Sequence, residues 1–306
     1  MENRGGQGAA ILTQIEELRS YVDSYDDLSE IIVNSDGSVW IERAGELLKT
    51  EVSFTQARVG SIIRLVAGYH RFIVNQDNPV LSAKFPAFHG GRFHALVPPL
   101  VAAPVISIRM PPRRVLSLED LYDNDTVGQK DYRTLLDALK RKQNIVIAGA
   151  TSSGKTTIAN ALIKTILQNH PDERFIISED NPELITNSST CVHILINSHF
   201  SHRDSVVNAL RLRPDRIIIG EIRDGAAALE LCKAWLTGHP GGITTIHASN
   251  ASAVHDRFYS LFQEVVISPD RKLIDAAINL IVFCEKVVIS SGKVVRRITE
   301  IKKGVL

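Results

Sequence analysis

The residues with the clearest chemical meaning in this chain are 149–156, whose sequence Gly-Ala-Thr-Ser-Ser-Gly-Lys-Thr matches the pattern G-x-x-x-x-G-K-T. A short apolar run, 144–148, precedes them, and residues 157–164 continue with apolar side chains at helical spacing. A strand, a glycine-containing loop and a helix in this order present backbone N–H groups and a helix N-terminus to phosphate oxygens. The sequence therefore predicts a nucleotide-binding loop.

The side chains of this loop indicate the ligands. We expect Lys155 to contact the β- and γ-phosphates of the nucleotide and the hydroxyl group of Thr156 to ligate Mg²⁺. The expected cofactors are therefore ATP and Mg²⁺, although no segment that would contact the base distinguishes ATP from GTP. The remaining residues expected to surround the phosphates are Gly149, Ala150, Thr151, Ser152, Ser153, Gly154 and Thr157.

An acidic segment follows the apolar run at 175–178 and contains Glu179, Asp180 and Glu183. Ligands of open parallel sheets bind beyond the carboxyl ends of the strands, so we expect these carboxylates to converge on the phosphates. Asp180 is a candidate ligand of Mg²⁺, and Glu179 and Glu183 are candidates for polarising the attacking water. The alternative interpretation is an acidic surface turn.

A second apolar run, residues 216–220, ends at Glu221. A carboxylate in this place suits a ligand of Mg²⁺ or the base that removes a proton from water, and Glu221 is our first candidate for the base. Arg211, Arg213 and Arg223 flank the run and are candidates for neutralising charge on the transferred phosphoryl group, within one chain or from a neighbouring subunit. Structural salt bridges are the alternative role for each arginine.

A third segment, residues 237–248, contains two histidines that bracket a Gly-Gly turn and a Thr-Thr pair. We expect His239 and His247 to form hydrogen bonds with the γ-phosphate or its water network and to sense the loss of that phosphate. The seven residues between the histidines do not match the zinc-binding pattern H-E-x-x-H, which argues against a zinc site.

Composition limits the class of protein. The chain has 306 residues, of which 35 are basic and 34 are acidic, so its formal net charge of +1 does not favour direct nucleic-acid binding. Three widely spaced cysteines predict neither a disulfide framework nor a zinc site. We find no signal sequence and no apolar run of about 18 residues that would span a membrane. The expected location is the cytoplasm.

The order of elements predicts an α/β fold with two domains. Residues 1–110 combine helical and hairpin patterns and form a smaller α+β N-terminal domain. Residues 111–125 begin with Pro111 and Pro112 and form a linker. In residues 126–306, apolar strands alternate with helices, which indicates a parallel sheet with flanking helices. We interpret this second domain as a RecA-like P-loop ATPase domain.

The phosphate loop and the three segments that follow it, in this order, closely resemble the secretion-ATPase superfamily, which powers type II and type IV secretion, type IV pili and conjugation. In the first domain, residues 30–34, 39–42, 91–93 and 107–109 are similar to the conjugative and type IV secretion branch. The chain also lacks the four-cysteine zinc insertion of type II secretion ATPases, which favours the same branch.

This resemblance implies a homohexameric ring with ATP bound between the two domains, where Arg92 and Arg109 match arginines that reach the phosphates. It also implies attachment to the cytoplasmic face of the bacterial inner membrane, without a transmembrane segment, and contact with inner-membrane and cytoplasmic components of a secretion channel. The function that follows is an ATP-hydrolysing motor of conjugative DNA transfer or type IV secretion, which drives pilus biogenesis and substrate transfer.

Three alternatives compete with this interpretation. One is a type IV pilus assembly or retraction ATPase, which the N-terminal residues argue against. Another is a slow-hydrolysing, nucleotide-gated assembly scaffold, suggested by Ser152, since this position is commonly glycine in the family and serine restricts the backbone. A translocase that acts directly on DNA is disfavoured by the near-zero net charge and by the absence of an aromatic, basic groove.

Overall fold

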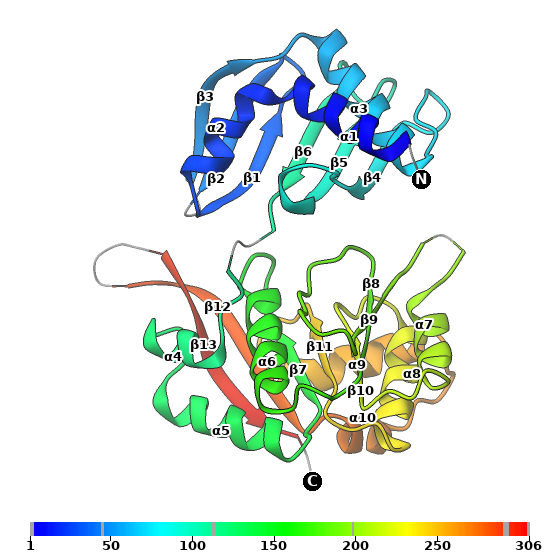
Figure 1. The fold of residues 1–306 in the computed structure, drawn as a ribbon. Helices are drawn as coiled ribbons and strands as arrows, with labels where there is room; N and C mark the ends of the chain where they lie inside the picture. Colours follow the sequence, from blue (N-terminus) through cyan, green and yellow to red (C-terminus); the bar gives the residue numbers. More distant parts are fainter. Residues whose placement is uncertain (1–2, 44–45, 112–113, 198, 290–293, 305–306) are drawn as a thin grey trace. The chain divides into compact units, whose positions relative to one another are not determined.

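The computed structural model describes residues 3–43, 46–111, 114–197, 199–289 and 294–304. The chain divides into two units, Met1–Arg114 and Val115–Leu306, and each has its own sheet and its own hydrophobic core (Figure 1).

The first unit is an antiparallel sheet covered by helices. Its six strands have the order β3-β2-β1-β6-β5-β4, and each neighbouring pair is antiparallel. Buried and less buried residues alternate along β5, because one face of the sheet packs against the helices. The elements are α1 (Asn3–Gln14), α2 (Glu16–Ser24), β1 (Leu28–Val33), β2 (Ser38–Arg43), β3 (Glu46–Ser53), α3 (Gln56–His70), β4 (Val80–Lys84), η1 (Phe88–Gly90), β5 (Arg92–Leu96) and β6 (Val105–Arg109).

The second unit contains a seven-stranded sheet of order β13-β12-β7-β11-β10-β8-β9, in which every pair is parallel except β12 with β13. Its elements are α4 (Leu118–Asp123), α5 (Gln129–Lys140), β7 (Ile145–Ala148), α6 (Lys155–Asn169), β8 (Phe175–Glu179), β9 (Val192–Leu195), α7 (His202–Ala209), β10 (Arg216–Ile219), α8 (Gly225–Leu236), β11 (Ile243–Ile246), α9 (Ala253–Gln263), α10 (Arg271–Ala277), β12 (Leu280–Val288) and β13 (Val294–Lys303).

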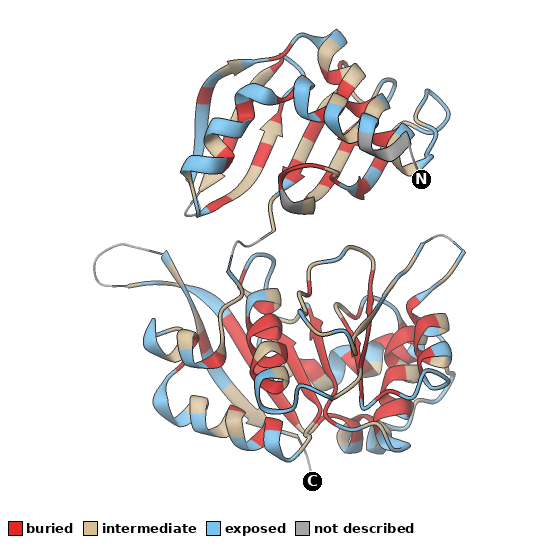
Figure 2. Cartoon of the chain, viewed as in Figure 1, coloured by how far each residue is buried: buried red, intermediate tan, exposed pale blue. Residues whose placement is uncertain are grey.

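The central strands of this sheet are buried on both faces. Every residue of β7, β10 and β11 is buried, and Figure 2 shows these strands as the most buried part of the unit. One core lies between the sheet and helices α4, α5 and α6, and the other lies beneath α7, α8, α9 and α10. The predicted α/β class, with a parallel sheet and a separate α+β unit before it, is confirmed.

Helix α4 lies in the segment that the sequence analysis assigned to the linker. Its leucines, Leu118 and Leu121, are buried in the core of the second unit, and Ser117 caps its N-terminus. The backbone N–H of Leu118 also donates to Thr165 Oγ1 on α6 at 3.1 Å. The division between units therefore falls after Arg114, because α4 packs as part of the second core. Among the residues that the structure describes, no helix has the length and apolar character needed to cross a bilayer.

Candidate nucleotide-binding site

The predicted strand, loop and helix are β7, residues 149–154 and α6. Helix α6 begins at Lys155 directly after Gly154, which has a φ of 103°. This left-handed conformation favours glycine and turns the chain into the helix. Ser152 also has a positive φ, of 59°, at the position where the family resemblance led us to expect glycine. The loop therefore forms with a serine in a conformation that L-amino acids seldom adopt.

Lys155 lies inside its own loop. The side-chain ammonium group donates to the carbonyl oxygens of Gly149 and Ala150 at 3.0 and 2.9 Å, and its Nζ atom lies 3.3 Å from Nδ1 of His247. Only 8% of the residue is exposed. This burial lowers the pKa of Lys155, and the nearby Glu221 carboxylate acts in the opposite direction. The ammonium group is thus held where phosphate oxygens are expected.

A chain of polar contacts extends from Lys155 to the acidic segment. Oε1 of Glu221 lies 2.9 Å from Nε2 of His247, and Oε2 of Glu221 accepts from Arg223 at 2.7 Å. Arg223 in turn donates to Asp180 at 2.6 Å. The hydrogen bond to Glu221 is the largest of the effects that raise the pKa of Arg223. The three segments that follow the loop therefore meet at the carboxyl edge of the sheet.

The residues beside Thr156 fit a magnesium ion. Thr156 Oγ1 donates to Oε2 of Glu183 at 3.3 Å, so a hydroxyl and a carboxylate oxygen lie together at the start of α6. Mg²⁺ at phosphate sites prefers oxygen ligands and needs only one or two carboxylates, because phosphates and waters complete its shell. Within the described ranges no cluster of three or more His, Cys, Asp or Glu residues has the arrangement of a dedicated metal site. Asp180, an expected metal ligand, instead pairs with Arg223.

Three expected site residues, Arg211, Arg213 and His239, lie elsewhere in the unit. Each precedes a strand, β10 or β11, that is part of the parallel sheet, whereas the phosphate loop follows the carboxyl end of β7. They therefore lie at the amino edge of the sheet, roughly 13 Å away for a four-residue strand. His239 Nδ1 lies 3.1 Å from the carbonyl oxygen of Pro214. This position does not favour contact with the phosphates of their own chain, and contact of Arg211 and Arg213 with the phosphates of a neighbouring subunit stays a prediction.

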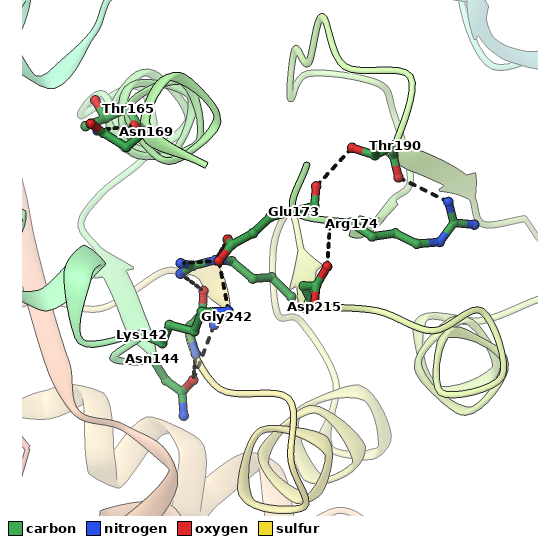
Figure 3. Close-up of polar contacts among 11 residues, drawn as sticks. Lys142, Asn144, Thr165, Asn169, Glu173, Arg174, Thr190, Asp215 and Gly242 are labelled. Atoms are coloured by element: carbon green, nitrogen blue, oxygen red, sulfur yellow. Dashed lines mark hydrogen bonds and ion pairs between the residues drawn. The ribbon is translucent and has the colours of Figure 1, made fainter. Parts of the chain in front are cut away.

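The amino edge carries a buried polar network that the sequence analysis missed (Figure 3). Asn144 Oδ1 accepts from the backbone N–H groups of Gly241 and Gly242 at 2.7 and 3.3 Å. Arg216, which is 1% exposed, donates to the carbonyl of Gly241 at 2.9 Å and pairs with Glu173 at 2.5 Å. The Gly-Gly turn therefore has a packing role. A charged residue at the start of an apolar strand was the sequence signal for this network.

A cavity of about 420 Å³ lies beside the phosphate loop. One wall comes from β13, where Arg296 Nε donates to the carbonyl oxygen of Ser152 at 3.0 Å. Residues lining the cavity include Asn124, Thr126, Gly154, Ile158, Val295 and Arg297. No sequence pattern could place β13 here, because Arg296 and Ser152 are 144 residues apart.

The two arginines of the first unit stand opposite each other. Arg92 in β5 and Arg109 in β6 are partners in the antiparallel register, so their Cα atoms are neighbours. Arg109 is exposed and Arg92 is half-buried. Their match to phosphate-contacting arginines of the superfamily stays a prediction.

Comparison with known proteins matches this architecture. Residues 17–297 match the sequence family described as type II/IV secretion system protein. This range includes the phosphate loop and all three segments after it. The chain belongs to this family. The match extends over most of both units, so it covers the antiparallel sheet as well as the parallel one.

Relatives in the type II/IV secretion family include a probable conjugal transfer protein TrbB of Sinorhizobium fredii, 35% identical over 274 residues, with 90% of this chain and 83% of the relative covered. The type IV secretion system protein VirB11 of Bartonella henselae is 31% identical, with 91% and 90% covered. Among solved structures, the VirB11 ATPase of the Brucella suis type IV secretion system, in complex with sulphate, is 25% identical, with a TM-score of 0.51 and 99% and 97% covered.

Proposed function

We propose that this chain is an ATP hydrolase that works as a motor in conjugative DNA transfer or type IV secretion. The observation that carries the proposal is the meeting of Lys155, Thr156, Glu183 and Glu221 at one edge of a parallel sheet, around a phosphate-binding loop. The relatives named for conjugal transfer and type IV secretion support the same role.

Binding of the triphosphate is the first task of these residues. The N–H groups at the start of α6 surround the phosphate oxygens, and Lys155 exchanges its bonds to the carbonyls of Gly149 and Ala150 for bonds to phosphate. Thr156 and Glu183 would hold Mg²⁺, which supplies positive charge against the phosphates when bound. The cavity beside β13 has room for the rest of the nucleotide.

Activation of water is the second task. Glu183 and Glu221 are the two candidates for the base, because both carboxylates lie at the loop and at the carboxyl edge of the sheet. Glu221 forms an ion pair with Arg223 and also contacts Nε2 of His247, so its charge is partly neutralised before any proton transfer. His247 contacts both Lys155 and Glu221 and is therefore placed to respond when the γ-phosphate leaves.

The assembly that fits the family resemblance is a homohexamer at the cytoplasmic face of the inner membrane, in contact with components of the secretion channel. In such a ring, Arg92 and Arg109 reach the phosphates. Arg211, Arg213 and His239 lie at the amino edge, away from the site of their own chain, and suit contact with a neighbouring subunit.

Phosphate release from Mg²⁺-ATP by the purified chain tests the hydrolysis directly. The Lys155→Ala variant is expected to lose activity by about 100-fold or more, because the lysine contacts the transferred phosphoryl group. Lys164→Ala is the matched control, since Lys164 lies on the same helix and donates to the carbonyl of Val115 at 2.7 Å, away from the loop. Equal activity of the Lys155→Ala and parent proteins would overturn the proposal.

A further inference from the structure

The acidic segment after β8 is held in place by two buried side chains. We propose that Asn160 is a positioning residue for hydrolysis: together with Glu179, it fixes residues 183–186 so that Glu183 stays against Thr156. This inference rests on the proposed hydrolysis, in which Glu183 contributes to the magnesium and water site.

Asn160 uses both ends of its amide group on this segment. The Nδ2 group donates to the carbonyl oxygen of Glu183 at 3.0 Å, and Oδ1 accepts from the backbone N–H of Ile185 at 2.8 Å. The residue is 4% exposed, so water does not compete for these bonds. A buried amide with a donor and an acceptor both engaged fixes the neighbouring backbone strongly.

The spacing on α6 explains why this matters for the site. Thr156 and Asn160 are four residues apart and therefore lie on the same face of the helix. Thr156 contacts the side chain of Glu183, and Asn160 contacts the main chain of the same residue. Helix α6 thus holds Glu183 at two points: Thr156, which is the last residue of the phosphate loop, and Asn160, one helical turn later.

Glu179 holds the same segment from the other side. It is 3% exposed, and its Oε1 accepts from the backbone N–H groups of Glu183 and Leu184 at 2.9 and 2.8 Å. Its Oε2 lies 3.4 Å from Nδ1 of His193, whose Nε2 lies 2.9 Å from Thr186 Oγ1. Both oxygens of Glu179 are therefore engaged with the segment and its support, which favours a positioning role over the expected polarisation of the attacking water.

The hydrogen bonds from Asn160 and Glu179 take the place of the backbone hydrogen bonds of a helix or a sheet. Residues 183–187 belong to neither a helix nor a strand, so side chains must satisfy and fix their peptide groups. A shift of about 1 Å in a reacting group can lower a rate by about 100-fold. Removing Asn160 therefore displaces the Glu183 carboxylate while leaving Lys155 and the loop intact, and this lowers kcat more than it changes KM.

Steady-state ATP hydrolysis by the full chain tests the proposal. Asn160→Leu, which has a similar volume and no hydrogen bonds, is expected to lower kcat by about tenfold or more and to change KM for ATP by less than about threefold. Asn169→Leu is the matched control, because Asn169 ends the same helix and its Nδ2 group donates to the carbonyl oxygen of Thr165 at 2.8 Å, away from the acidic segment. An unchanged kcat in Asn160→Leu, or an equal loss in Asn169→Leu, would overturn the proposal.

Combination with Glu183→Gln separates positioning from general damage. If Asn160 acts through Glu183, adding Asn160→Leu to Glu183→Gln lowers kcat by less than about threefold further, whereas independent effects multiply. Glu179→Gln keeps the Oε1 acceptor and is expected to retain more activity than Glu179→Leu. The inference would be contradicted if the losses of kcat in Asn160→Leu and Glu183→Gln multiply in the double variant, or if Glu179→Gln and Glu179→Leu lose the same activity.

Folding and the parent activity are checked in the same series. Thermal unfolding reports whether each variant is folded. If Asn160→Leu does not fold, Asn160→Asp serves in its place, because it keeps the acceptor for Ile185 and loses the donor to Glu183. If the parent protein does not hydrolyse ATP, or if its hydrolysis persists in Lys155→Ala, the proposed function itself is contradicted. A parent that hydrolyses ATP and a double variant with multiplied losses would contradict only the role of Asn160.

Discussion

Replacement of Ser152 by glycine should stabilise the protein. Ser152 has a φ of 59°, and the left-handed conformation costs an L-residue about 1–2 kcal/mol relative to the right-handed one. Glycine removes this cost but has a more flexible unfolded chain, which opposes the gain by about 0.5–1 kcal/mol. The net gain is about 0.5–1 kcal/mol, since Ser152 is exposed and little packing is lost.

Thermal and urea unfolding measure this gain. For a unit of this size, about 1 kcal/mol raises Tm by about 2–4 °C, so Ser152→Gly is expected to raise Tm by about 1–4 °C. Ser152→Ala is the control, because alanine loses the hydroxyl group and keeps the Cβ atom that makes the conformation costly. A Tm of Ser152→Gly equal to or below that of Ser152→Ala would refute the reasoning.

The same variant separates the motor from the slow scaffold. The backbone already has the loop conformation with serine, and the Ser152 carbonyl that accepts from Arg296 is kept in glycine. We therefore expect Ser152→Gly to change kcat for ATP by less than about threefold. A rise of tenfold or more would favour the scaffold, whose turnover the serine limits.

Three further predictions concern stability and reactivity. Burial acts to raise the pKa of Glu173, but hydrogen bonds from Arg216 and Lys142 outweigh it and lower the pKa below 4.5. In urea unfolding, the parent should therefore be more stable than Glu173→Gln above about pH 4.5, and this difference in stability should shrink as the pH falls through the pKa of the folded protein. A difference in stability that does not change with pH would contradict this prediction. A Cβ atom at Gly242 would lie 1.9 Å from Nε1 of Trp235, so Gly242→Ala should destabilise the protein by about 2 kcal/mol or more in urea, and Gly128→Ala, with open space around it, should be close to neutral; equal losses would count against the packing role. Burial raises the pKa of Cys232 to about 12, so peptide mapping should find this thiol alkylated at pH 8 only after unfolding, and rapid labelling of the native protein would disagree.

The strands and the phosphate loop were predictable because short apolar runs bounded by polar turns are a strong signal for buried parallel strands. The run at 144–148 is β7 within one residue, and the run at 216–220 is β10 within one residue. The carboxylates after the strands, Glu221 and Glu183, were predictable for a topological reason, since the carboxyl ends of parallel strands share an edge.

The position of three expected site residues at the amino edge has the same topological reason. Arg211, Arg213 and His239 come before their strands, so the direction of the chain places them at the edge opposite to the phosphate loop. Closeness to a strand along the chain does not by itself place a residue at the phosphate site, because only the residues after a parallel strand lie at its carboxyl end. The signal was present in their order along the chain.

Other contacts could not be predicted from this one sequence. Asn160 has the appearance of any polar residue on an amphipathic helix, and only the path of residues 183–186 shows that its amide group is engaged. Likewise, Arg296 reaches Ser152 because β13 pairs with β12, and that pairing follows from the three-dimensional packing of the second unit.

The most direct test of the central claim is ATPase activity per subunit as a function of protein concentration, with light scattering to follow assembly. We expect activity per subunit to rise as rings form and to vanish at every concentration in Lys155→Ala, since the proposed motor uses arginines of neighbouring subunits and the phosphate loop together. Tight ATP binding with negligible hydrolysis at all concentrations would contradict the account.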